Sequence, residues 1–192
     1  SKQSFTITYI AGRRGLPQGN GITIAFPQHG WSPPSADKNK DGYICAENTG
    51  SASISVEVGS KVGDRRSPHV SGWVTVKVIS GELKEGDEII IYYGGKGQDA
   101  PGAEVQNQPV KTMSFVMCYT LNPLPSFMGD VNDEAFPGYS VFLNRLAEEP
   151  KLEVVPGKAN RIDCIIPSIA ASGESIKAKF VLTDKCRNPA LS

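Results

Sequence analysis

Apolar and polar residues alternate along most of this chain, and the alternation predicts β-strands. The stretch 5–10 (FTITYI) alternates strictly, and 21–26 (GITIAF) repeats the pattern after a loop rich in glycine and proline. Because successive side chains of a strand point to opposite faces, a two-residue period is typical of a strand with one buried face. The same reasoning predicts strands at 43–45, 53–58, 72–79, 87–93 and 110–119. Such a series, with turn signals between its members, favours an antiparallel sandwich or barrel over alternating strands and helices.

The clearest signal lies between Ser80 and Tyr119. A turn of glycine and charged residues at 81–88 leads into the β-branched and aromatic run 89–93, which two glycines end. Residues of this kind suit a pleated, half-buried surface, and glycine suits the turns on either side. The segment therefore indicates β-structure strongly, but it contains no pattern of catalytic or ligand-binding residues.

Two predicted strands allow their faces to be assigned. In 72–79, Val74, Val76 and Val78 share one face, and Trp73 lies on the other. In the last strand of the series, large apolar side chains alternate with smaller ones: Met113, Phe115, Met117 and Tyr119 against Thr112, Ser114 and Cys118. We expect the first set of each strand to face the core.

The composition changes at 121–125 (LNPLP), which predicts a linker or domain boundary. The one helical candidate follows at 139–149, where apolar residues have helix-like spacing and Pro150 forces a stop. Beyond it the pattern is strand-like again, at 152–155, 160–166 and 175–183. These last strands are too few for an immunoglobulin-like domain of about 100 residues, so they either complete the first sandwich or belong to a second module cut partway.

The predicted fold is therefore all-β: an antiparallel β-sandwich, immunoglobulin-like or of jelly-roll type, with one short helix. Three regions are expected, namely a sandwich domain at 1–122, a linker with the helix at 123–150, and strands of the second or completing module at 151–192.

Net charge and hydropathy argue against two classes of partner, nucleic acids and membranes. The 192 residues hold 20 Lys and Arg against 20 Asp and Glu, so the formal net charge is zero. A nucleic-acid-binding domain usually has a basic excess, and the one dense basic spot, Arg65 and Arg66, lies beside Asp64. No apolar run approaches the ~20 residues that span a bilayer. We expect neither nucleic-acid binding nor membrane insertion.

The four cysteines are Cys45, Cys118, Cys164 and Cys186, and none has the C-x-x-C spacing of a zinc or redox motif. A hairpin centred near residues 171–172 would place Cys164 opposite about Lys179, with Cys186 beyond the paired region. Disulfide-bonded Cα atoms lie within about 7 Å, so this pair is not expected to bridge. We predict free, mostly buried thiols.

A candidate cation site lies in the long loop 27–42 and just after it. Asp37, Asn39, Asp41 and Tyr43 occur with the spacing of the first half of a calcium loop, where alternate oxygens converge on a hard cation. The closing glutamate is missing, because position 48 is Asn48, and no helices flank the loop. Asp, Asn and Gly are also ordinary turn residues, so a solvated turn is the alternative.

A second candidate is an aromatic platform for stacking on sugars, formed by Trp31, Trp73, Tyr92 and Tyr93. Trp31 lies in a loop beside two prolines, and we expect it to be the more exposed tryptophan. Trp73 lies in a strand, where packing between sheets is the simpler role. These two tryptophans are the ligand-stacking candidates.

Catalytic patterns are weak. The carboxylates between positions 82 and 88 flank a predicted turn and alternate with Lys84, which favours a solvated hairpin end over acid–base chemistry. His69 follows Ser67 and Pro68 in a predicted loop, without the strand–turn–helix context of a nucleophile elbow. We expect no catalytic residues and no cofactor, with calcium as the one alternative.

Several short motifs resemble a large uncharacterised prokaryotic family. The pattern Gly-x-Leu-x-x-Gly-Asp-x-Ile, a strand, a glycine turn and Pro-Gly-x-x-x-Gln is present here as Gly81, Leu83, Gly86, Asp87, Ile89, Gly94, Pro101, Gly102 and Gln106. The opening of the chain is also similar, and so is its end, where Asp184-x-x-x-Asn188-Pro189 resembles the start of the family's next, immunoglobulin-like module.

In that family such a region usually precedes a metal-dependent hydrolase domain similar to the polymerase-and-histidinol-phosphatase superfamily. The resemblance implies an accessory region, because the Gly-Asp-Leu-His-x-His metal motif of that domain is absent from this sequence. The sequence thus predicts a non-catalytic structural or interaction module of a larger, hydrolytic protein, whose partners are the other domains of that protein. The alternative is a carbohydrate- or calcium-binding module that uses the loop 27–42.

Overall fold

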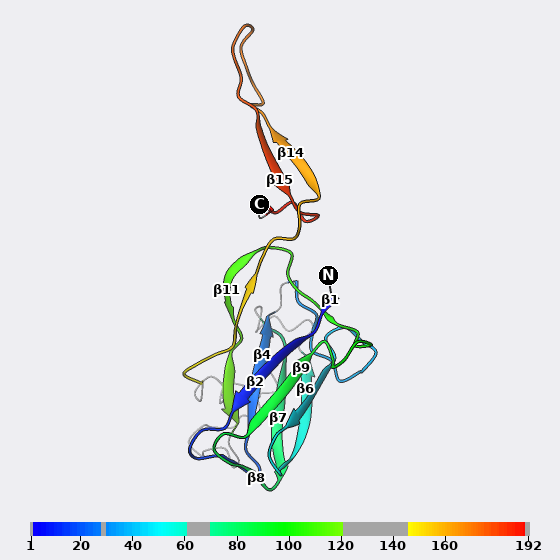
Figure 1. The fold of residues 1–192 in the computed structure, drawn as a ribbon, viewed down its shortest axis with the longest axis vertical. Coiled ribbons are helices and arrows are strands. Elements are labelled where there is room, and N and C mark those ends of the chain that lie inside the picture. The colour runs from blue at the N-terminus through cyan, green and yellow to red at the C-terminus, as the bar shows by residue number, and fades with distance from the viewer. Residues whose placement is uncertain (1, 28–29, 61–69, 121–145, 191–192) are drawn as a thin grey trace. The chain divides into compact units, whose positions relative to one another are not determined.

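The computed structural model describes residues 2–27, 30–60, 70–120 and 146–190. These residues form antiparallel strands and no helix, so the all-β prediction is confirmed for this part of the chain (Figure 1). The predicted helix at 139–149 lies mostly outside the described residues, and its described end, 146–149, is not helical. Within the described part of the chain, no helix is long and apolar enough to cross a membrane.

The chain divides into two compact units. We call the first the body, residues 1–105 and 114–151, and the second the C-terminal unit, residues 106–113 and 152–192. Each is described separately below.

The larger sheet of the body has four strands in the order β12-β4-β7-β6: Met117–Thr120, Gly21–Pro27, Val70–Ser80 and Ser53–Ser60. The register pairs Ile22 with Val76 and Ile24 with Val74, so the apolar sets of two neighbouring strands lie side by side on one face. Val74, Val76 and Val78 are fully buried, as their alternation predicts.

The smaller sheet has three strands in the order β2-β9-β5: Phe5–Ile10, Glu88–Tyr93 and Ile44–Asn48. Ile7 pairs with Ile91, and both are buried. Two short pairs complete the body: β1 (Lys2–Gln3) with β10 (Ala103–Glu104), and β3 (Leu16–Pro17) with β8 (Glu82–Leu83).

The buried faces of the two sheets meet in the core. The rings of Phe26 on β4 and Tyr93 on β9 lie 4.7 Å apart between centroids. The Tyr9 hydroxyl on β2 donates to that of Tyr119 on β12 over 3.0 Å. Figure 1 shows β2 and β9 in front of β4 and β7. The period-two apolar pattern thus fills a single core between two layers.

The strand expected at 110–119 is divided into two. Its first half is β11 (Val110–Ser114), which pairs with β13 (Lys151–Val154), and its second half is β12. Between them the Phe115 N–H donates to the Pro150 carbonyl. Cys118, which was assigned to the outer face, is fully buried together with Met117. The prediction of a single strand with one buried face is therefore wrong here.

The C-terminal unit contains a hairpin of β14 (Arg161–Ile165) and β15 (Lys179–Thr183). Cys164 lies opposite Phe180, one residue from the predicted register, and Cys186 lies beyond the paired region. All four cysteines are free, as predicted. They are not mostly buried, since Cys118 alone among them is buried and Cys164 is exposed.

Candidate functional site

The calcium candidate folds as an exposed turn. One Asp37 carboxylate oxygen accepts the N–H of Asn39 over 3.0 Å, and Asp41 forms a 2.8 Å ion pair with Lys2. The Tyr43 N–H donates to a backbone carbonyl of the same turn. Each of the two carboxylates therefore already has a partner of the kind that surface turns use. Among the described residues, no group of three or more His, Cys, Asp or Glu side chains could hold a metal ion. Calcium binding stays a prediction.

Trp31 lies in the core, so its predicted exposure is wrong. The residue is 4% exposed, and its ring packs edge-on against Phe115 with centroids 5.3 Å apart. The loop is fixed beside it, because the Tyr93 hydroxyl donates to the Ser32 carbonyl over 2.5 Å. The Ser32 hydroxyl in turn accepts the N–H of Glu104. Part of the long loop is thus packed onto the core and held there by hydrogen bonds at Ser32. The Trp31 ring is too buried to stack on a ligand.

Trp73 is half-buried on the face of β7 that points away from Val74. Its ring covers Gly59 on the neighbouring strand, where an added Cβ would lie 2.1 Å from a ring atom. Tyr92 and Tyr93 likewise point to opposite faces of β9, as neighbouring strand residues must. The four aromatic candidates are therefore divided between the core and the outer surfaces.

The outer face of the smaller sheet carries a polar cluster of Glu47, Tyr92 and Lys96. The Glu47 carboxylate accepts hydrogen bonds from the Tyr92 hydroxyl at 2.5 Å and the Lys96 ammonium at 2.6 Å. The hydrogen bond from Lys96, followed by that from Tyr92, lowers the pKa of Glu47. Cys45 lies beside the cluster, and burial raises the pKa of its thiol. A raised pKa makes the thiolate scarcer at neutral pH, so this is a surface ion-pair cluster and not an activated nucleophile.

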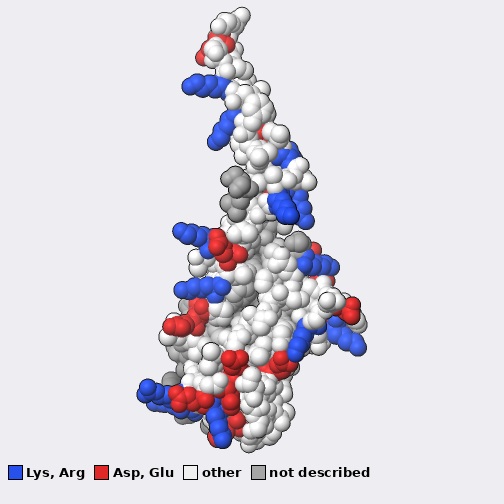
Figure 2. Space-filling view, viewed as in Figure 1, with Lys and Arg blue, Asp and Glu red and all other residues white. Residues whose placement is uncertain are grey.

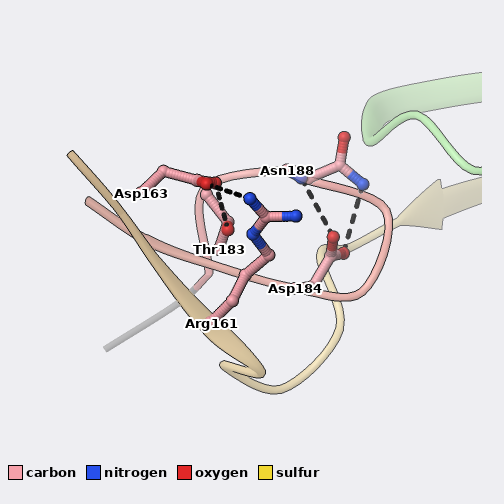
Figure 3. A network of polar contacts seen from close by, with 5 residues as sticks. All are labelled: Arg161, Asp163, Thr183, Asp184 and Asn188. Atoms are coloured by element: carbon pink, nitrogen blue, oxygen red, sulfur yellow. Dashed lines mark hydrogen bonds and ion pairs between the residues drawn. The ribbon is translucent and has the colours of Figure 1, made fainter. Parts of the chain in front are cut away.

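In the C-terminal unit, sequence reasoning missed a turn that Asp184 organises (Figure 3). Its carboxylate accepts the backbone N–H groups of Gly157, Cys186 and Asn188, all within 2.9 Å. These bonds, first the one from Gly157, lower the pKa of Asp184 to about 2. The side chain of Asn188 also donates to the Asn107 carbonyl, so the turn holds distant segments of the unit together. The Asp184-x-x-x-Asn188 spacing was the one signal of it in the sequence.

A second polar contact lies on one face of the hairpin. Asp163 accepts a hydrogen bond from the Thr183 hydroxyl over 2.7 Å (Figure 3). Its carboxylate also forms an ion pair with Arg161 over 2.5 Å. The bond from Thr183, followed by that from Arg161, lowers the pKa of Asp163. Thr183 is 4% exposed, so this face of the hairpin is covered at the end where Thr183 pairs with Arg161.

The opposite face of the hairpin is apolar and exposed. Direct cross-strand pairs place Ile162 beside Leu182 and Cys164 beside Phe180. Ile162, Phe180 and Leu182 are 66%, 69% and 51% exposed. We call these four residues the apolar hairpin face. In the view of Figure 2, the surface around β14 and β15 is largely white, with basic side chains projecting from it.

Comparisons of the sequence and the structure with protein-family models, with curated proteins and with solved structures found no match.

Proposed function

We propose that this chain is a non-catalytic structural or interaction module of a larger protein. Its body would be an immunoglobulin-like or jelly-roll β-sandwich, and its C-terminal unit would carry the contact surface. One observation supports this above the others: of the ten large hydrophobic residues that are exposed among the described ones, eight lie between Val155 and Leu182.

This concentration distinguishes the C-terminal unit from the body. Single apolar residues scattered over a surface are normal, whereas exposed apolar residues gathered in one part of a protein are more typical of a binding site. The body has only Ile10 and Ile79 in this class among its described residues. The C-terminal unit therefore carries the apolar surface that a partner would cover.

The identity of the larger protein is inferred from the resemblance alone. The motifs around Gly81, Asp87 and Pro101 connect this chain with regions that precede metal-dependent hydrolase domains. A hydrolytic domain elsewhere in the same protein would then carry the chemistry, and the present chain would position or support it.

The gene tests this proposal directly. We expect the reading frame to continue past the codon for Ser192 into further β-rich sequence and then a Gly-Asp-Leu-His-x-His motif. A stop codon immediately after Ser192, with no such domain in the same protein, would contradict the larger-protein part of the proposal.

A protein chemistry experiment tests the contact surface. In the full-length protein, amide hydrogen exchange in β14 and β15 should be slower than in the isolated chain 1–192, because a partner covers the hairpin. The matched control is β2, whose pairing with β9 lies within the body and should exchange equally in both. Equal exchange of the hairpin in the two proteins would count against a contact there.

A further inference from the structure

We draw no further inference here: the strongest candidate, the hairpin of β14 and β15 with its exposed apolar side chains and the exposed Lys177 and Lys179 beside them, carries none, because nothing in the structure shows what covers it.

Discussion

The body and the C-terminal unit are built from the same period-two alternation, yet they bury their apolar residues differently. In the body, the apolar faces of two sheets meet, and Ile22, Val76 and Ile91 are fully buried. In the C-terminal unit, a single hairpin has an apolar face that no described part of the chain covers, with Phe180 at 69% exposure. Alternation thus specifies which side chains share a face, and the presence of a second layer decides whether that face becomes a core.

The two units also differ in where their charged contacts lie: on the surface in the body, and at a buried carboxylate in the C-terminal unit. The body carries its described ion pairs on its surface, as in Lys2 with Asp41 and Lys96 with Glu47. The C-terminal unit is held by Asp184, a carboxylate at 4% exposure that accepts several backbone N–H groups. The body therefore depends mainly on hydrophobic packing, while the C-terminal unit depends more on a hydrogen-bonded turn.

The largest effect is expected from Phe26→Ala, which tests the packing of the body. Phe26 is fully buried and contacts Tyr93 and Phe115, at centroid distances of 4.7 and 5.8 Å. Removing a buried aromatic side chain costs about 3–5 kcal/mol of unfolding free energy, because apolar contacts are lost and a cavity is left. Chemical denaturation followed by tryptophan fluorescence measures this loss.

The control for that variant is Ile79→Ala, also in the body but 51% exposed. It should change the unfolding free energy by no more than about 0.5 kcal/mol. Amide NMR signals of β14 and β15 should be unchanged in Phe26→Ala under native conditions. A loss below about 1 kcal/mol for Phe26→Ala would mean that the two sheets do not share the core described here.

A smaller effect, confined to the C-terminal unit, is expected on acidification. The pKa of Asp184 is about 2 in the folded protein against an ordinary value of 3.8, so the charged form is the one that folding favours. Its contribution is therefore fully present above about pH 4 and is lost as the pH falls through the folded pKa near 2. Asp163, whose pKa is also lowered, acts in the same direction.

Asp184→Asn separates this carboxylate from the others. At neutral pH the variant should loosen the turn, seen as faster amide exchange at Gly157, Cys186 and Asn188, whose N–H groups lose a charged acceptor. Its exchange rates should then depend less on acidification between pH 4 and 2 than those of the wild type. An unchanged pH dependence would show that Asp184 does not control the turn.

The sequence predicted most of the strands of the body because their signal is local. The strands 5–10 and 21–26 were expected within one residue of β2 and β4, since apolar alternation and flanking turns lie in the same short stretch. The interruption at Phe115 could not be predicted, because it depends on a backbone bond to Pro150 far along the chain. Local patterns contain no information on such a contact.

The candidate site was predicted less well than the fold, for a similar physical reason. Trp31 lies in a loop without periodicity, and its burial depends on bonds that Ser32 makes with Tyr93 and Glu104, both more than 60 residues away. The strand pattern of the hairpin was visible in the sequence, and pairing by alternation was within one residue of the structure. Which face is covered depends on the second layer, and the sequence of the hairpin does not encode that layer.

The smallest effect is expected from Ile169→Ser, which tests whether the hairpin has any cover within the single chain. Ile169 lies in the loop between β14 and β15 and is 89% exposed. A side chain already in water loses little burial on truncation, so the unfolding free energy should change by no more than about 0.5 kcal/mol. Ile24→Ser, the same replacement at a fully buried position of β4, should cost several times more. If Ile169→Ser instead destabilised the monomer by more than about 1 kcal/mol, part of the chain would have to cover the hairpin, and the contrast between the two units would disappear.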